Sequence, residues 1–205
     1  MITVIDYGVG NLRSVAKALE SVGAEVCVSG GAEDLRRAER LVLPGVGAFA
    51  PGMANLKAGG LIDVLAEEVR DKGKPLLAIC LGMQLLARES HENGVHRGLD
   101  WLPANVVEFD LSRMSLKVPH MGWNEVIPQE DSPFFAGLGR TPVFYFVHSY
   151  HVVCDEPKMV AATARYGVTF TAALRYENIF ATQFHPEKSQ DNGLRLLRNF
   201  VSWKV

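Results

Sequence analysis

Short apolar runs alternate with helical stretches through the first half of the chain. The runs are Ile2–Asp6, Glu25–Val28, Leu41–Leu43 and Leu76–Ile79, and the helical stretches are Leu12–Val22 and Leu61–Lys72. In both helical stretches the apolar residues recur at helical spacing and form one face. Strands that are apolar on both faces belong in a parallel sheet with helices packed against it. The sequence therefore predicts an α/β fold around a mostly parallel central sheet.

The second half of the chain is richer in strands. β-Branched and aromatic residues between turn signals predict strands at Asn105–Phe109, Asn124–Ile127, Val143–Val153, Val160–Arg165 and Thr169–Phe184, followed by a helix at about Asn192–Trp203. We expect these strands to form an antiparallel extension of the sheet. Because we find no linker, repeat or low-complexity segment, we expect one domain over residues 1–205.

The composition argues against several classes of protein. The net charge is −2, so no overall positive field attracts nucleic acid or an anionic membrane. No stretch reaches the ~18 apolar residues that span a bilayer, and the N-terminus lacks the pattern of a signal peptide. Cys27, Cys80 and Cys154 are widely spaced and form no CxxC pair or zinc pattern. We therefore expect a cytoplasmic protein without nucleic-acid or membrane partners.

Cys80 follows the apolar run Leu76–Ile79 directly, and a helical segment starts at once after it. A strand, a sharp turn and a helix form the elbow that presents a nucleophile. Small residues, Ala78 and Gly82, flank the cysteine as such a turn requires, although many elbows have Gly in place of Ala78. The helix N-terminus favours a thiolate, and the amide of Leu81 is suited to stabilise an oxyanion. The alternative is a small buried cysteine at a strand end.

His185 and Glu187 flank Pro186, which favours extended backbone at the histidine. Residues two apart in an extended segment point to the same side, so the carboxylate is expected beside the imidazole. A carboxylate in that position holds the tautomer of a catalytic histidine. The alternative is a surface turn, but together with the elbow cysteine the pattern favours a Cys80–His185–Glu187 triad.

The other histidines are weaker candidates. His148 and His151 fall in one predicted strand, where an odd separation points side chains to opposite faces. They are therefore not expected to share a metal ion. His91, His96 and His120 lie in polar surroundings and are expected to be solvated. We expect no metal site.

Two glycine pairs follow predicted strands. Gly45 and Gly47 surround Val46 in the segment Pro44–Ala48, where glycine permits unusual backbone angles close to a ligand. This loop is a candidate for the second oxyanion donor, or else an ordinary turn between a strand and a helix. Gly8 and Gly10 lack the third glycine of the dinucleotide fingerprint, because position 13 is Arg13. We expect no nicotinamide and no other cofactor.

Taken together, these motifs resemble those of the class I, or triad, glutamine amidotransferases. Within that family the chain is most similar to the glutaminase subunits of imidazole glycerol phosphate synthase. The resembling segments, in family order over nearly the whole chain, are Asp6–Asn11, Pro44–Gly47, Cys80–Gln84, Pro119–Asn124, Tyr145–Tyr150 and Gln183–Ser189. The resemblance implies a flavodoxin-like central sheet flanked by helices.

The resemblance also implies a role for each matching residue. Cys80 attacks the carboxamide of glutamine, His185 moves the protons and Glu187 orients His185. The substrate-binding positions are Gln84, Glu92, Ser149 and Tyr150, and the oxyanion positions are Leu81, Val46 and Gly47. In this family the Pro-Gly-Val-Gly loop offers no ready oxyanion donor until a peptide reorients, here at Val46.

The partner implied by the resemblance is a (β/α)₈ cyclase subunit in a heterodimer. Ammonia would pass through that barrel to a nucleotide substrate, giving imidazole glycerol phosphate and an aminoimidazole carboxamide ribonucleotide. The segments that resemble the interface contain Asn11, Met121, Trp123, Tyr145 and Lys188. For Met121 and Trp123 the alternative is core packing. Arg113 and Lys117 are expected to belong to a solvated loop.

Three other functions remain open on the residues alone. The chain is alternatively the glutaminase of another class I amidotransferase, a non-catalytic binding subunit with the same fold, or a stand-alone cysteine hydrolase. The segment Pro119–Asn124 argues against the first, and an intact Cys80, His185 and Glu187 against the second. The third predicts full turnover without any partner.

Overall fold

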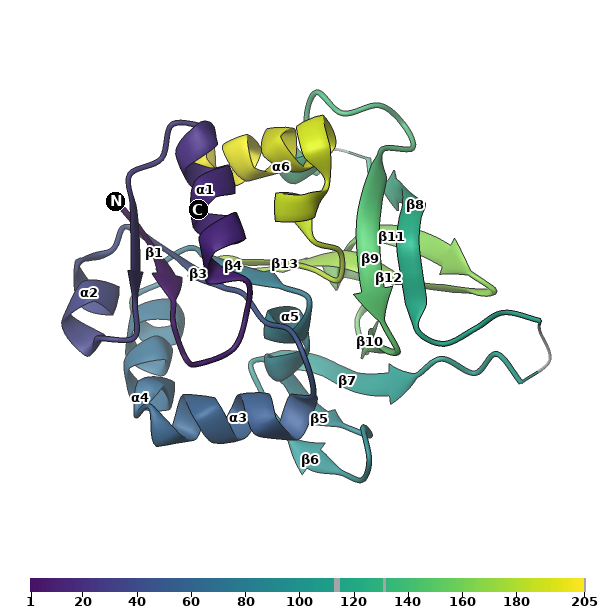
Figure 1. The fold of residues 1–205 in the computed structure, drawn as a ribbon, viewed down its shortest axis with the longest axis horizontal. Helices are drawn as coiled ribbons and strands as arrows, with labels where there is room; N and C mark the ends of the chain where they lie inside the picture. The colour runs from purple at the N-terminus through teal and green to yellow at the C-terminus, as the bar shows by residue number, and fades with distance from the viewer. Residues whose placement is uncertain (113–114, 131, 205) are drawn as a thin grey trace.

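The computed structural model describes residues 1–112, 115–130 and 132–204. Its strands form two sheets, one of nine strands and one of four. Helices lie on both sides of the larger sheet (Figure 1).

The nine-stranded sheet has the order β2-β1-β3-β4-β13-β12-β11-β8-β9. Its parallel part consists of β2 (Val26–Ser29), β1 (Ile2–Ile5), β3 (Arg40–Leu43), β4 (Leu76–Ile79) and β13 (Ile179–Thr182). Its antiparallel part consists of β12 (Val168–Tyr176), β11 (Val160–Tyr166), β8 (His120–Pro128) and β9 (Val143–His148). The predicted α/β fold with an antiparallel extension is confirmed.

The four-stranded sheet has the order β10-β7-β5-β6. Its members are β10 (Tyr150–Cys154), β7 (Leu102–Glu108), β5 (Ala87–Ser90) and β6 (His96–Arg97). Only Ser149 separates β9 from β10, so the chain crosses from one sheet to the other there. The predicted single strand Val143–Val153 is therefore wrong: each half pairs with a different sheet.

Two layers of helices cover the central sheet (Figure 1). On one face lie α1 (Leu12–Ser21) and α6 (Gln190–Ser202), and on the other lie α3 (Phe49–Ala58), α4 (Leu61–Leu65) with its π-helical continuation η1 (Ala66–Asp71), and α5 (Leu81–Leu85). The short helix α2 (Ala32–Arg37) follows β2, and 3₁₀ turns occur at η2 (Pro133–Phe135), η3 (Pro157–Met159) and η4 (Pro186–Lys188).

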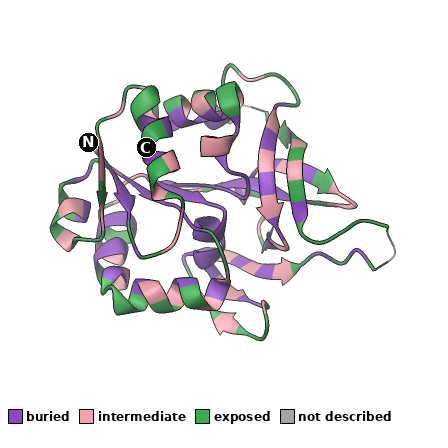
Figure 2. Cartoon of the chain, viewed as in Figure 1, coloured by how far each residue is buried: buried purple, intermediate pink, exposed green. Residues whose placement is uncertain are grey.

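The residues of β4 show why the strand is apolar on both faces. Leu77 and Ile79 belong to the hydrophobic core beneath α1 and α6, whereas Leu76 and Ala78 belong to the core beneath α3 and α4. All four are at most 1% exposed, and Figure 2 shows the central strands buried along their length. This burial fixes β4 and so fixes the position of Cys80 at its end.

Four further elements differ from the sequence-based expectation. The helices α2 and α3 were not predicted. The predicted strand Thr169–Phe184 is a hairpin of β12 and β13, which turns at Glu177 with a φ of 52°. The predicted helix Leu61–Lys72 changes to π-helix from Ala66 onward.

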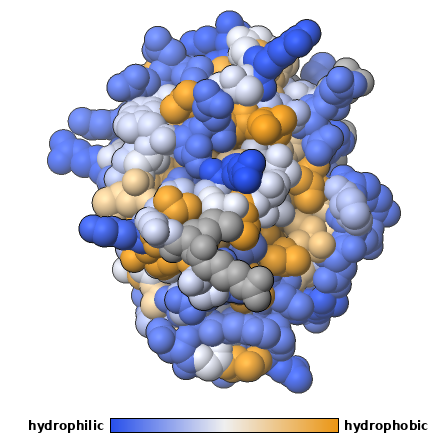
Figure 3. Space-filling model, turned by 90° about the vertical axis from the view of Figure 1, so that its right-hand side faces the viewer, coloured by the Kyte–Doolittle hydropathy of each residue, from blue (hydrophilic) through white to orange (hydrophobic). Residues whose placement is uncertain are grey.

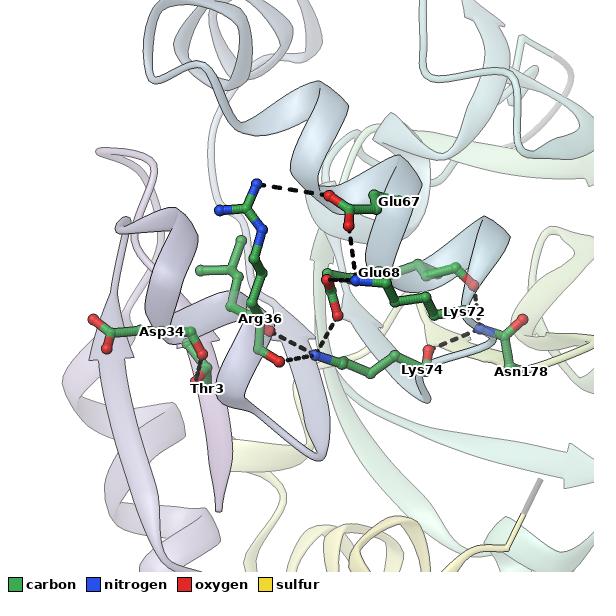
Figure 4. Close-up of polar contacts among 10 residues, drawn as sticks. Thr3, Asp34, Arg36, Glu67, Glu68, Lys72, Lys74 and Asn178 are labelled. Carbon is green, nitrogen blue, oxygen red and sulfur yellow. Dashed lines mark hydrogen bonds and ion pairs between the residues drawn. The ribbon is translucent and has the colours of Figure 1, made fainter.

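A buried ion pair anchors the chain just before β4 (Figure 4). Lys74 Nζ lies 2.6 Å from Glu68 Oε2 and also donates to the carbonyls of Leu35 and Arg36. Burial alone would raise the pKa of Glu68, but hydrogen bonds from Lys72 and Lys74 hold it below its usual range. The network joins η1 to α2 and to the start of β4.

Arg113 lies outside the described residues, and Lys117 is exposed as expected. Among the residues that the structure describes, no helix is long and apolar enough to cross a membrane.

Candidate active site

Cys80 sits on a strained turn between β4 and α5. Its φ and ψ are 55° and −108°, a region that non-glycine residues seldom adopt and that costs about 1–3 kcal/mol. Its amide donates to the Thr182 carbonyl at 2.7 Å, which ties the turn to β13. A Cβ on Gly82 would lie 2.0 Å from the Leu43 carbonyl oxygen, so only glycine fits two residues after the cysteine. The local geometry is that of a nucleophile elbow.

His185 lies between β13 and η4, and Glu187 lies within η4. His185 Nδ1 is 2.8 Å from Glu187 Oε1, and both side chains are 2% exposed. The backbone of His185 is extended, but Pro186–Lys188 forms a 3₁₀ turn. The expected contact is therefore present, although the turn produces it and not the extended segment that the sequence suggested.

The electrostatics of His185 link it to Cys80. Burial alone would lower the pKa of His185, but the negative charge of nearby Cys80, together with the charge and hydrogen bond of Glu187, outweighs burial and raises the pKa to about 10. His185 Nε2 is buried and has no hydrogen-bond partner among the described residues. This nitrogen is therefore available for proton transfer at the cavity that both residues line.

The cysteine sulfur has two further polar neighbours. Gln183 Nε2 donates to Cys80 Sγ at 3.7 Å, and the Val147 carbonyl oxygen lies 4.0 Å from the sulfur. The Tyr7 hydroxyl donates to the Pro44 carbonyl at 2.7 Å, and burial, with the negative charge of Cys80, raises the Tyr7 pKa. Sequence reasoning named neither Gln183 nor Tyr7 as a site residue, though Gln183 lies two residues before His185.

A cavity of about 320 Å³ opens beside Cys80, within the usual size range of small-molecule sites. Its wall contains all the predicted oxyanion and substrate-binding residues: Val46, Gly47, Leu81, Gln84, Glu92, Ser149 and Tyr150. Cys80 and His185 also line it, together with Pro119, Val147 and His148. The chain thus brings residues from both sheets to one small chamber.

The wall holds several groups that are fixed by hydrogen bonds. Gln84 Nε2 donates at 3.1 Å to both the Tyr150 carbonyl and Gln183 Oε1. Glu92 Oε2 accepts a hydrogen bond at 2.6 Å from the Phe49 amide at the start of α3. The Glu92 carboxylate therefore caps a helix and borders the cavity at the same time.

The glycine loop packs directly against the elbow. A Cβ on Gly45 would lie 2.6 Å from the Tyr7 hydroxyl and 2.8 Å from Leu81 Cβ, so a side chain does not fit. Gly47 has a φ of 95°, which favours glycine, and Val46 between them is 40% exposed. The loop is thus tightly held at Gly45 and open at Val46.

Three buried histidines surround Phe109 near the cavity. Its ring centroid lies 5.1 Å from that of His148 and 4.7 Å from that of His151, so the expectation that these two point to opposite faces is wrong. The reason is the break at Ser149, which separates their strands. His120 is 3% exposed, so its expected solvation is wrong as well.

Hydrogen bonds connect His120 and His148. His120 Nδ1 is 2.9 Å from His148 Nε2, and His148 Nδ1 donates to the Tyr150 carbonyl at 2.9 Å. Burial lowers the pKa of His120 to about 4, and burial lowers that of His148 to about 3. Both rings are therefore neutral at pH 7. Within the described residues no group of three or more His, Cys, Asp or Glu is arranged to hold a metal ion.

The predicted interface residues gather mainly on the outer surface of β8 and β9. Met121 and Trp123 are 62% and 50% exposed, so neither packs in the core. Tyr145 pairs with Trp123 across the strands with ring centroids 5.9 Å apart, and Lys188 Nζ lies 5.6 Å from the Tyr145 ring centre. Asn11 is exposed and caps α1. Figure 3 looks onto this side of the molecule, where hydrophobic surface (orange) lies among hydrophilic surface (blue).

Nearly the whole chain matches one protein family and relatives with similar names. Residues 3–203 match the family model described as glutamine amidotransferase class-I. The chain is 52% identical over 204 residues to imidazole glycerol phosphate synthase subunit HisH of Syntrophotalea carbinolica, covering 98% of each chain. It is 49% identical over 201 residues to subunit HisH 2 of Pseudomonas aeruginosa, again covering 98% of each.

Solved structures with lower sequence identity share the fold. A crystal structure described as a glutamine amidotransferase has a TM-score of 0.75 at 22% identity, covering 98% of this chain and 96% of that one. A putative GMP synthase subunit from Thermoplasma acidophilum has a TM-score of 0.72 at 21% identity, with coverages of 98% and 91%.

Proposed function

The chain belongs to the class I glutamine amidotransferases, and on that premise we propose that Cys80, His185 and Glu187 hydrolyse glutamine to glutamate and ammonia. The proposed enzyme is the glutaminase subunit of imidazole glycerol phosphate synthase in histidine biosynthesis. The observation that carries the proposal is the meeting of Cys80 with the His185–Glu187 pair at one cavity wall. Relatives about half identical along the whole chain carry that subunit's name.

The first half of the reaction forms a thioester. His185 borders the same cavity as Cys80 and takes the thiol proton, so the sulfur attacks as a thiolate. Cys80 Sγ bonds to the carboxamide carbon, and the C=O electrons move to the oxygen. His185 Nε2 then protonates the amide nitrogen, the C–N bond breaks and ammonia leaves.

The second half uses water. His185 Nε2 takes a proton from a water molecule, whose oxygen attacks the thioester carbon. The C–S bond breaks, the thiolate of Cys80 returns and glutamate is released. Glu187 keeps the ring in the tautomer that presents Nε2 to the cavity, and stabilises the imidazolium in both halves.

The oxyanion needs donors fixed before the charge develops. The amide of Leu81, at the N-terminus of α5, is the first proposed donor. The second comes from the loop of Val46 and Gly47 on the facing wall, with the Val46 peptide as the group that reorients. Two glycines beside an exposed Val46 lower the barrier to that change.

The ends of the substrate are proposed to bind away from the sulfur. Gln84 uses both amide hydrogens on protein acceptors, so its Oε1 remains to accept from the substrate. Glu92 offers negative charge to the α-ammonium group, and Ser149 and Tyr150 offer backbone groups to the α-carboxylate. These four residues surround a space that suits one amino acid.

The proposed partner is a (β/α)₈ cyclase subunit that receives the ammonia. Pro119 lines the cavity, and the exposed Val118 and Met121 lie on either side of it in the sequence. The cluster of Trp123, Tyr145 and Lys188 supplies aromatic and cationic groups of the kind enriched in interfaces. The products of the complex are imidazole glycerol phosphate and an aminoimidazole carboxamide ribonucleotide. The proposed compartment is the cytoplasm, where Cys27, Cys80 and Cys154 stay reduced.

The test is ammonia release from glutamine by this chain with a cyclase subunit and its nucleotide ligand. We expect release with the wild type and with Cys154→Ala, and none with Cys80→Ala. Full turnover by the chain alone would instead indicate a stand-alone hydrolase. Cyclase-dependent function that survives Cys80→Ala would indicate a binding subunit, and failure to bind the cyclase would indicate another class I glutaminase.

A further inference from the structure

Gln183 is a buried amide that touches the reactive sulfur but has no part in the reaction steps above. It follows the last residue of β13, and its own backbone amide donates to the Ala172 carbonyl at 2.8 Å. The residue is 0% exposed. Its side chain lies between Cys80 Sγ, 3.7 Å from Nε2, and Gln84 Nε2, 3.1 Å from Oε1.

The surrounding groups determine which way this amide points. The Tyr150 carbonyl can only accept, so the group of Gln84 that faces it is the NH₂. The same NH₂ also contacts Gln183, which must therefore turn its oxygen toward Gln84. The NH₂ of Gln183 is then directed at the sulfur, and a donor in that place favours the charged form of a thiol.

Few other groups near the sulfur stabilise a negative charge on it. The Val147 carbonyl oxygen lies 4.0 Å from Sγ and disfavours negative charge there. The titratable groups around the sulfur and along the cavity are Tyr7, His148, Tyr150, Glu92 and His185. Of these, His185 alone brings a positive charge, because His148 is neutral at pH 7. A neutral donor beside the sulfur therefore adds support that does not depend on the proton of His185.

We infer that Gln183 is a positioning residue, which holds the Cys80 sulfur as a thiolate with one end of its amide and holds Gln84 in its substrate-accepting orientation with the other. The role of the Gln84 end rests on the proposed function. The sulfur end does not, since it concerns Cys80 in the absence of substrate.

The test measures the pH dependence of alkylation at Cys80 by iodoacetamide, followed by mass spectrometry of the Cys80 peptide. Cys27 and Cys154 serve as internal references in the same digest. Gln183→Met removes both contacts, whereas Gln183→Glu keeps an oxygen for Gln84 and replaces the donor by a carboxylate. Asn178→Ala is the matched control, because Asn178 is also a buried amide with two hydrogen bonds, to the carbonyls of Val69 and Lys74.

We expect the midpoint of Cys80 alkylation to rise by about one pH unit in Gln183→Met, which is a change of about 1.4 kcal/mol. In Gln183→Glu it should rise by at least as much, since a carboxylate repels the thiolate. The midpoint belongs to the coupled pair of Cys80 and His185, so it is compared only between variants. Asn178→Ala should lower the melting temperature and leave the midpoint unchanged.

An unchanged midpoint in folded Gln183→Glu would overturn the inference and leave a structural role only. If Gln183→Met does not fold, the near-isosteric Gln183→Glu decides alone. Ammonia release by the wild type with the cyclase subunit is measured on the same preparation. Its absence together with a shifted midpoint would refute the proposed substrate and retain the role at the sulfur.

Discussion

Acidification should destabilise this protein through the buried pair His120 and His148. The ordinary histidine pKa is 6.5, and burial lowers the pKa of these rings to about 4 and about 3. Between pH 7 and pH 5 the unfolded chain therefore takes up protons on both rings while the folded chain does not. Because the folded pKa is the lower one, the stabilisation is present above pH 6.5 and is lost as the pH falls.

The magnitude follows from the distance between pH 5 and the unfolded pKa. At 1.36 kcal/mol per pH unit, a ring that stays neutral in the folded state loses about 2 kcal/mol of stability by pH 5. We take the full value for His148 and about half for His120, since exposed residues 115–119 precede it and solvent screens charge there. The expected loss from the pair is about 3 kcal/mol between pH 7 and pH 5.

Urea unfolding at the two pH values measures this loss in the wild type and in His120→Asn/His148→Asn. Asparagine keeps a donor near the position of Nδ1 but cannot titrate, so the double variant should lose about 3 kcal/mol less than the wild type. His151 and His185 are present in both proteins, so their contributions cancel in the comparison. The raised pKa of His185 gives a pH effect of opposite sign to that of the pair, and this effect is the same in both proteins. His91→Asn removes an exposed ring and should behave as the wild type. A difference below about 0.5 kcal/mol would refute the reasoning.

Three further outcomes are expected. Glu187→Gln should lower kcat for glutamine about tenfold or more with little change in KM, because the carboxylate acts on His185 and not on the substrate; an unchanged kcat would exclude this role. Lys74→Met should destabilise the fold by about 3 kcal/mol in thermal or urea unfolding, because it removes a partner of the buried Glu68. Since the pKa of Glu68 is lowered in the fold, the stabilisation by its ionised carboxylate is present above pH 4.5 and disappears as the pH falls further. Equal stability of Lys74→Met and the wild type at pH 7 would contradict this prediction. Gly82→Ala should cost about 3 kcal/mol in stability and abolish turnover, because its Cβ would lie 2.0 Å from the Leu43 carbonyl oxygen, whereas Gly139→Ala meets open space and should be neutral; equal melting temperatures would refute it.

The parts of the fold that follow local rules were predictable from sequence. The apolar run Leu76–Ile79 has a strand length and no helical spacing, and it forms β4 with the cysteine directly after it. The amphipathic spacing of Leu12–Val22 gave α1 to within one residue. The family suggested by the motifs is confirmed by the match over residues 3–203.

The parts that depend on distant partners were not predictable. The apolar stretch around Ser149 contains no Gly or Pro, and only the positions of two separate sheets divide it into β9 and β10. Phe49–Ala58 contains Pro51 and Gly52, which disguise α3, although Pro is tolerated in the first turn. His120 is buried by rings from other strands, including Phe146 and Phe170, and its neighbours in sequence are polar or exposed.

Because β13 lies between β4 and β12, the candidate active site is completed only late in translation. While the ribosome is still adding the later strands, β4 has β3 on one side and an open edge on the other. The nascent chain already carries Cys80 but lacks the Thr182 carbonyl that holds its amide, and it lacks His185. The turn at Cys80 is thus completed only when β13 is inserted, shortly before η4 and α6. A growing chain therefore exposes the unpaired edge of β4 until β13 has been added, and a product truncated before that point carries Cys80 without His185.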